Sequence, residues 1–526
     1  MPYRGGFSGA GSIVVLCIFL TACQGSTPSE SQTARNTLNI ATYSGLSALN
    51  PLLGVSGISS KFGDLVYDGL IRLDARMEAV PHLAASWRIS DNGRRWVFFL
   101  RSGVRFHDGV ELTAEDVVFT YDLIQREGRS GHYGNGFQEV EQVTAGGRYK
   151  VEILLRKPSP AFLNYLDAPI LPRHLWEGED LKGSQLNRRP VGTGPYRLTA
   201  WEEDGIRLEA NRDYFLGPPP VKEIRIRSYP SQEAAWAGLI AGEADFFWLT
   251  NPKGYKVMEQ VHHLKIYRVP KPYVYMVAFN MTSPLFGDRR VRQALNYAVD
   301  KEALVRDVLS GMGRVAAGPV FTGSWAYRGD LAPYPYDPPK AMALLRKAGW
   351  KERDQDHLLE KDGKIFSFTL YTNQGDDIKN RAALMIQQNL WDLGIRMKVV
   401  SVPASATGFL YQKRFDAVFL DLYSVGDPDY YTYRFWHSSQ IQGGLNFFSY
   451  RDSDVDRLLD EGRTVWDQTE RRRIYGEFQE TIRADPPGVF LFWGEYLIGL
   501  NRRFAGPESG VDCNLGTIGR FCITEP

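Results

Sequence analysis

The chain has 526 residues, a length that exceeds one ordinary hydrophobic core and predicts two or three domains. Its 62 basic and 61 acidic residues leave a net charge of +1, which argues against nucleic acid or an acidic surface as its main partner. Aromatic residues make up 13% of the chain. A large hydrophobic core accounts for that content. An aromatic-lined ligand cleft is the more specific interpretation.

The N-terminus has the features of an export signal. Arg4 supplies positive charge, and residues 12–20 form an apolar run that is too short for a bilayer span of about 20 residues. The sequence LTAC that ends at Cys23 resembles a bacterial lipobox, and this resemblance implies a signal peptide over 1–23 and a lipid on Cys23; a plain secretory peptide is the alternative. Residues 24–36 are polar and predict a flexible tether. We therefore expect an exported protein, held by lipid at the periplasmic face of a membrane or at the cell surface.

Turn and cap residues predict the first elements after the tether. Residues 91–93 (Asp-Asn-Gly) predict a hairpin turn between strands at 87–89 and 96–100. Thr113 is predicted to cap a helix, with Asp116 at the third helical position in a near capping-box arrangement.

The stretch from Val191 to Trp248 has a regular order of turn, strand and helix signals. It opens with VGTGPYRL, in which Gly192 and Gly194 are predicted to break the chain sharply. Ser231 is predicted to cap a helix. Apolar and polar residues alternate over 196–200, 206–210 and 221–226, which predicts a half-buried hairpin and a further strand.

The sequence VGTGPYRL, followed by NRDYFLGPPPVKEIRIRSYPSQEAAWAGLIAGEADF, resembles the middle of the large extracellular solute-binding proteins of ABC importers. The group with the greatest similarity is the dipeptide-, oligopeptide- and nickel-binding family, family 5. The resemblance implies a mixed α/β, periplasmic-binding-protein-like fold of the large type, with two lobes, an extra domain and a ligand cleft between the lobes. The expected division is a first lobe of 37–62, 186–272 and 492–526, an extra domain of 63–185, and a second lobe of 273–491.

The second half of the chain predicts alternating strands and helices. Lys271 to Asn280 alternates as a strand, and Arg289 to Val308 is an amphipathic helix interrupted near Asp300, in a string, RRVRQALNYAVDKEALV, that is also typical of the family. The remaining predicted elements are strands at 366–371, 394–400, 415–420, 489–493 and 497–500, and helices at 381–393 and within 452–484.

The ligand-binding residues are predicted from loops that the resemblance places at the cleft and from the loop after strand 415–420, since open sheets bind ligands at such loops. These candidates are Tyr43, Ser44, Tyr133, Asp421, Tyr423, Ser424, Asp427 and Trp436. In peptide-binding members a carboxylate of this loop pairs with the peptide's amino terminus, and the corresponding residue here is Ser424. A buried ammonium without its carboxylate costs roughly 3–5 kcal/mol. Either Asp421 or Asp427 replaces that carboxylate, or the solute has no free amino terminus there.

Few residues suggest a disulfide, a metal site or a cofactor. Cys513 and Cys522 form a disulfide in an oxidising compartment or remain as two thiols. The adjacent pair His262-His263 lies in a polar stretch and is more simply a surface feature than a metal site, so we expect neither a metal nor another cofactor.

The sequence therefore predicts a solute-binding component of an ABC importer that captures a peptide or peptide-like solute, as a monomer, and delivers it to a permease. Since the chain has no phosphate-binding loop, a separate ATPase subunit must supply the energy. Binding of an oligosaccharide or of a nickel or other metal chelate is the alternative in the same role. An exported hydrolase is a weaker alternative, and we expect no enzyme, because neither Gly-x-Ser-x-Gly nor His-Glu-x-x-His occurs.

Overall fold

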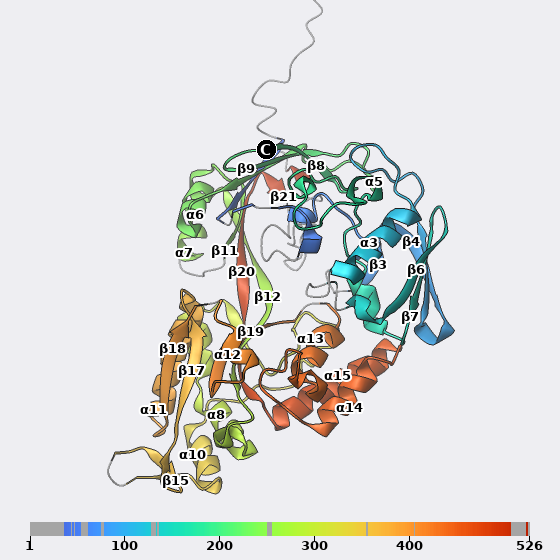
Figure 1. The fold of residues 1–526 in the computed structure, drawn as a ribbon. Coiled ribbons are helices and arrows are strands. Elements are labelled where there is room, and N and C mark those ends of the chain that lie inside the picture. Colours follow the sequence, from blue (N-terminus) through green and yellow to red (C-terminus); the bar gives the residue numbers. More distant parts are fainter. Residues whose placement is uncertain are drawn as a thin grey trace, which may run out of the picture.

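The structure is a computed structural model, shown in Figure 1. The predicted signal peptide with Cys23, the tether up to residue 35, Ser44, and the pairing of Cys513 with Cys522 lie outside the described residues. Within these residues, no helix has both the length and the apolar character needed to cross a membrane. The described residues are 36–43, 45–46, 48–53, 62–74, 78–127, 133, 136–249, 255–353, 356–403, 405–424, 426–505 and 522–523.

One sheet of eleven strands runs through the molecule. It mixes parallel and antiparallel pairs, as the α/β prediction requires. Its strand order is β18 (Arg396–Val402), β17 (Ser367–Asn373), β19 (Ala417–Tyr423), β12 (Leu264–Phe279), β20 (Gly488–Asn501), β11 (Phe246–Leu249), β1 (Thr37–Thr42), β10 (Glu223–Ser228), β9 (Gly205–Ala210) and β8 (Tyr196–Trp201), with β13 (Gly313–Val315) also paired to β20.

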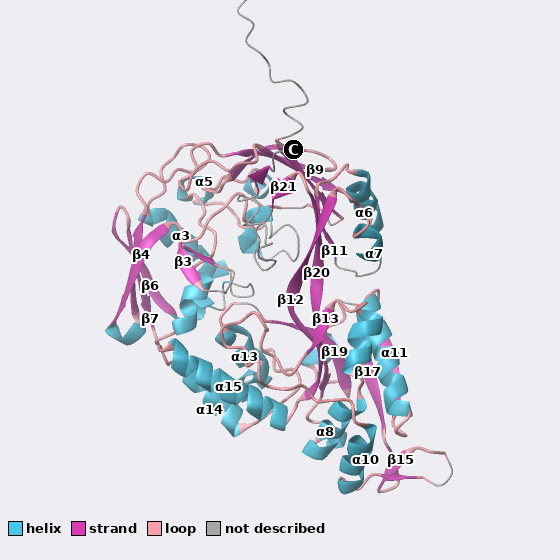
Figure 2. Cartoon of the chain, turned by 180° about the vertical axis from the view of Figure 1, so that it is seen from behind, coloured by secondary structure: helices cyan, strands magenta, loops and turns pink. Residues whose placement is uncertain are grey.

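Two long strands connect the two ends of this sheet. β12 and β20 pair antiparallel from Leu264 opposite Asn501 to Ala278 opposite Gly488, and Figures 1 and 2 show them running between the upper and lower parts of the molecule. The pairing shifts register between Pro270 and Val274. Because Pro270 interrupts the alternation of apolar residues, the sequence predicted only the second half of β12. The expected domain boundaries at 272/273 and 491/492 fall inside these strands.

The upper part of the sheet carries the predicted hairpin and helix. β8 and β9 form the antiparallel hairpin, and β10 pairs with β9 and β1. Helix α6 (Gln232–Ala241) begins at Ser231, whose hydroxyl accepts a hydrogen bond from the Ala234 N–H at 3.1 Å. The short helix α7 (Tyr255–Met258) lies near it in Figure 1. These local predictions are confirmed.

A separate four-stranded sheet forms beside this part, within the segment expected to be the extra domain. Its order is β4 (Ala84–Ser90), β5 (Arg95–Leu100), β7 (Lys150–Leu155) and β6 (Val140–Gly147). Helix α3 (Ala114–Glu127) covers a core that includes Trp96 and Phe98. The predicted turn joins β4 to β5, and Asp116 accepts hydrogen bonds from the N–H and hydroxyl of Thr113, so both predictions are confirmed. A two-stranded pair, β2 (Ile71–Leu73) and β3 (Ala79–Pro81), lies alongside.

Helices pack on both faces of the lower part of the sheet, as two separate cores show. Asp300 interrupts the helix predicted at 289–308, since its carboxylate accepts a hydrogen bond from the Ala303 N–H at 2.9 Å. The region predicted as one helical stretch at 452–484 divides where Asp467 caps a new helix. The helices are α8 (Arg289–Ala298), α9 (Lys301–Ala303), α10 (Pro338–Lys347), α11 (Asp377–Trp391), α12 (Gly408–Tyr411), α13 (Pro428–Trp436), α14 (Ser453–Gly462) and α15 (Gln468–Ala484).

Candidate functional site

The loop after β19 buries Ser424 inside the lower part of the molecule. Ser424 is 2% exposed. Its hydroxyl accepts a hydrogen bond from the Phe321 N–H at 3.1 Å and donates one to the Pro319 carbonyl at 3.2 Å. The hydroxyl is therefore engaged with the neighbouring loop at 319–321.

The Asp427 carboxylate is engaged with Arg471 of α15. Two guanidinium N–H groups donate to its two oxygens, each at 2.6 Å, and the two side chains are only 4% and 6% exposed. Asp427 also accepts a hydrogen bond from the Asp429 N–H at 3.0 Å, which caps α13. Burial alone lowers the pKa of Arg471, but the Asp427 carboxylate outweighs it and raises that pKa. This is a closed structural ion pair.

Asp421 is the third polar candidate, and it pairs with Lys379 of α11. The Lys379 Nζ lies 2.5 Å from the Asp421 Oδ1. The lysine side chain is 6% exposed and the aspartate side chain is 40% exposed, so the pair lies at the edge of the lobe. Lys379 also donates to the Asn373 side chain at 3.0 Å. All three polar candidates of this loop thus have partners within their own lobe.

Two aromatic candidates lie apart from the loop. Tyr43 follows β1 and contacts Phe247 edge-on, with 6.3 Å between ring centres. Trp436 is 1% exposed and stacks on Phe448 at 5.3 Å, within the core that α14 and α15 cover. Trp436 lies on the face of α13 that packs against that core. Periodicity alone does not distinguish a core-facing position on a helix from a ligand-facing one.

Tyr423 belongs to a group of phenols where β12, β19 and β20 meet. The rings of Tyr423 and Tyr273 are 5.2 Å apart, and Tyr273 shares a side-chain hydrogen bond with Tyr496. Burial raises the pKa of all three phenols, which keeps them neutral. The Lys271 Nζ lies 5.0 Å from the centre of the Tyr496 ring.

Tyr133 approaches this group from the extra domain, together with two carboxylates that sequence reasoning missed. Asp64 and Asp167 act electrostatically on both Tyr133 and Tyr423. Burial first, and then the Asp64 charge, raise the pKa of Asp167 to about 7. The interlobe cluster, as we call this set, is Asp64, Tyr133, Asp167, Tyr273, Tyr423 and Tyr496.

One signal in the sequence points to Asp167. It is the only charged residue in the run YLDAPIL at 165–171, whose apolar side chains form part of the core of the extra domain. A charged residue inside such a run either has a partner or marks a functional site. Asp167 lies far along the chain from the loop after β19, so the pattern of residues in that loop does not point to it.

Comparison with known proteins identifies the family. A sequence model of the bacterial extracellular solute-binding proteins, family 5 Middle, matches residues 78–443. The chain belongs to family 5 of the extracellular solute-binding proteins. These are the solute-binding components of ABC importers, so the predicted family and transport role are confirmed.

Similar family 5 proteins cover almost the whole chain. The chain is 34% identical to the oligopeptide-binding protein AppA of Bacillus subtilis over 520 residues, 94% of each chain. The solved structure of AppA in complex with a nonapeptide has a TM-score of 0.77 at 32% identity, covering 93% of this chain and 99% of AppA. The structure of NikZ from Campylobacter jejuni in complex with Ni(L-His) has a TM-score of 0.79 at 31% identity, with the same coverage. These likenesses confirm the two-lobed, periplasmic-binding-protein-like fold.

In this family 5 chain, two aromatic contacts among the described residues join the segment expected to be the second lobe to the segment expected to be the extra domain. Trp466, between α14 and α15, packs against Trp96 with 5.6 Å between ring centres. A Cβ atom at Gly93 would lie 2.1 Å from the Trp466 ring, so this turn has room for the indole only because residue 93 is glycine. Tyr430 of α13 meets Tyr165 edge-on at 5.5 Å.

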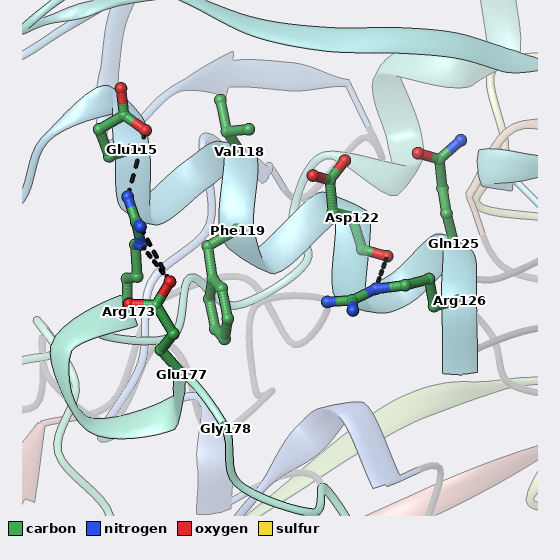
Figure 3. A pocket seen from close by; sticks show the side chains of 9 residues that line it. All are labelled: Glu115, Val118, Phe119, Asp122, Gln125, Arg126, Arg173, Glu177 and Gly178. Carbon is green, nitrogen blue, oxygen red and sulfur yellow. Dashed lines mark hydrogen bonds and ion pairs between the residues drawn. The ribbon is translucent and has the colours of Figure 1, made fainter.

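A groove of about 690 Å³ lies between α3 and α5 (Arg173–Trp176), as Figure 3 shows. Arg173 pairs with Glu115 at 3.5 Å and with Glu177 at 2.8 Å. No residue of the interlobe cluster lines this groove. The charged groups of the groove partly neutralise one another. Its lining residues are Glu115, Val118, Phe119, Asp122, Gln125, Arg126, Arg173, Glu177 and Gly178.

Proposed function

We propose that this protein captures a peptide or peptide-like solute between its lobes, outside the cytoplasm, and delivers it to an ABC permease when the lobes close. The observation that carries the proposal is the interlobe cluster, in which phenols and carboxylates from separate parts of the chain act on one another electrostatically. Such groups suit a solute with apolar side chains and a positive charge. The oligopeptide-binding AppA of Bacillus subtilis, 34% identical to this chain, supports the peptide class.

The remaining parts of the proposal concern anchoring, subunits and domains. A lipid on Cys23 would hold a monomer at the membrane, and separate permease and ATPase subunits would complete the importer, with no catalysis by this chain. The two lobes and the extra domain follow the division given above, with β12 and β20 as the shared connection. Because a solute that contacts both lobes favours the closed state, binding itself would drive closure.

A nickel chelate is the second candidate solute. NikZ, 31% identical to this chain, was solved with Ni(L-His). In the described part of the chain no group of three His, Cys, Asp or Glu side chains is arranged to hold a metal ion. A chelate that brings its own ligands to the metal would need few from the protein, so this class stays a candidate.

The test is binding by the signal-free protein to defined pools. Native mass spectrometry and melting curves would be recorded with peptides of two to nine residues, with nickel–histidine, and with oligosaccharides. A solute at about a hundred times its dissociation constant stabilises the folded state by roughly 2.7 kcal/mol, which gives a clear shift. Stabilisation by the peptide pool alone supports the proposal. A shift with only nickel–histidine or a sugar would refute the peptide class.

We expect Trp466→Ala to weaken solute binding by roughly tenfold. The indole contacts Trp96 and Gly93 of the extra domain, and an aromatic contact of this kind is worth about 1 kcal/mol beyond its buried area. Since it joins the two sides of the molecule, its loss lowers the population of the closed state and raises the apparent dissociation constant. Small-angle scattering of the ligand-free variant should show a larger radius of gyration.

The matched control is Trp391→Ala, which removes an exposed indole at the end of α11. It should leave both the affinity and the radius of gyration unchanged. Equal affinities for Trp466→Ala and the wild type would show that this contact does not bias closure.

A further inference from the structure

Among the described residues of the loop that holds the solute's amino group in peptide-binding members, each carboxylate has a cation partner. Asp421 pairs with Lys379, which Asp376 also approaches at 3.5 Å. Asp427 pairs with Arg471, and Asp429 lies 3.2 Å from the Arg463 guanidinium. Moving Asp427 to a ligand would leave the buried Arg471 guanidinium without its counter-ion. Because the Ser424 hydroxyl is already hydrogen-bonded at both its donor and its acceptor, it does not replace a carboxylate either.

Asp167, in the segment between the 3-10 helix at 160–165 and α5, is in the reverse situation. Part of its surface remains accessible, yet its Oδ1 is buried and has no hydrogen-bond partner. Asn164, in the preceding 3-10 helix (Pro160–Tyr165), also has a buried side-chain oxygen without a partner. Two buried acceptors without donors in one short segment need an external donor, and the charged one needs a cation.

The backbone holds Asp167 firmly in place. A Cβ atom at Gly69 would lie 2.4 Å from the Asp167 carbonyl oxygen, so only glycine permits this approach. On either side of Asp167, the Ile170 N–H donates to the Asp68 carbonyl at 2.9 Å and the Ile71 N–H donates to the Leu166 carbonyl at 3.2 Å. A side chain held in this way is preorganised for a ligand.

The groups that act electrostatically on Asp167 are Asp64 and the phenols of Tyr121, Tyr133 and Tyr423. Burial and the Asp64 charge raise the pKa of Asp167 to about 7, although a hydrogen bond from its own backbone N–H acts in the opposite direction. A raised pKa is the direction expected of a carboxylate without a counter-ion. Phenol oxygens accept hydrogen bonds and phenol rings attract cations. This environment favours an ammonium group over a carboxylate or a phosphate.

We propose that Asp167, within electrostatic range of Asp64, Tyr133 and Tyr423, binds the ammonium group of the solute. The amino group is then held by a carboxylate of the extra domain and not by one of the loop after β19. This inference rests on the proposed peptide function, and it names the charge that the solute carries at this place.

The test compares a peptide pool of two to nine residues with the same pool after N-terminal acetylation, using lysine-free sequences. The wild type should bind the free-amine pool about 100-fold more tightly than the acetylated pool, since a buried ion pair is lost. Asp167→Asn should lose most of this preference and bind both pools weakly. Isothermal titration calorimetry at pH 8 gives the affinities.

Glu115→Gln is the control, because it removes an exposed carboxylate of the same domain and should keep the wild-type preference. If Asp167→Asn keeps the full preference for free amines, the ammonium binds elsewhere and the inference is wrong. If the wild type binds both pools equally, the inference fails while the peptide function stands. If the wild type binds neither pool, the peptide function fails and this inference fails with it.

A measurement without ligand checks the state of Asp167 and the folding of the variant. A raised pKa means that the folded state of the wild type loses stability as the pH rises from 3.8 to about 7. Ligand-free Asp167→Asn should therefore melt at a higher temperature than the wild type at pH 8, and this gap should close as the pH falls toward 4. A lower melting temperature of the variant at pH 8 would show that Asp167 already has a partner, against the inference.

Discussion

Asp427→Asn is expected to lower the free energy of unfolding by about 3–5 kcal/mol, because the buried Arg471 guanidinium loses its bidentate counter-ion. The wild-type pair is bidentate, with both hydrogen bonds at 2.6 Å. The guanidinium also donates to the Gly462 carbonyl at 3.0 Å, and it lies 5.1 Å and 5.6 Å from the centres of the Trp325 and Tyr475 rings. The Asp429 carboxylate acts on it electrostatically but is itself paired with Arg463 at 3.2 Å, so it compensates the lost bidentate pair only in part.

Urea denaturation followed by hydrogen exchange in α13 and α15 would measure this loss in the lobe concerned. Asp454→Asn is the matched control, because it breaks an exposed pair with Arg457 and should cost less than about 1 kcal/mol. Combining Asp427→Asn with Arg471→Met should recover part of the stability, since the buried charge is then removed as well. A loss of less than 1 kcal/mol in the single variant would contradict this account of the pair.

Gly192→Ala is expected to cost about 3 kcal/mol or more, because the added methyl group has no space. Its Cβ would lie 2.0 Å from the Val66 carbonyl oxygen. That oxygen accepts a hydrogen bond from the Gly194 N–H at 2.8 Å, and the Gly192 carbonyl accepts one from the His107 N–H at 2.9 Å. The backbone on both sides is thus held and has little freedom to move away from the new methyl group.

Thermal unfolding of the purified variant measures this effect. Gly318→Ala is the control, since a Cβ atom at that position meets nothing within 4 Å and its backbone is not left-handed. The control should stay within about 0.5 kcal/mol of the wild type. An equally small effect of Gly192→Ala would mean that the segments carrying Val66 and Gly192 separate easily.

Gly192 and Gly194 show which structural features the local sequence predicts and which it does not. Gly192 and Gly194 were interpreted as residues that break the chain, which accounts for their position in a turn. Neither has a positive φ, and the structure requires glycine there because the chain passes directly against the Val66 backbone. That reason depends on a segment more than a hundred residues earlier, so no local pattern contains it.

Caps and turns could be predicted residue by residue, because the atoms involved are neighbours in the chain. The turn at 91–93 is closed by a hydrogen bond from the Arg94 N–H to the Asp91 carbonyl. The cap at Ser231 and the interruption at Asp300 follow from side chains that accept a hydrogen bond from a backbone N–H three residues later. The long strands β12 and β20 were predicted only in pieces, since their continuity depends on pairing with each other across an irregular register.

The sequence by itself determined the α/β class and the short elements, because these are set by local hydrogen bonding and by patterns of apolar residues that recur along the chain. The family followed from resemblance to known sequences. Only the tertiary structure decided which carboxylates are engaged. Asp427 meets a cation 44 residues away and Asp421 one 42 residues away, whereas Asp167 has a buried oxygen with no partner in its surroundings. Charge pairing depends on distance in space, and the fold alone sets that distance.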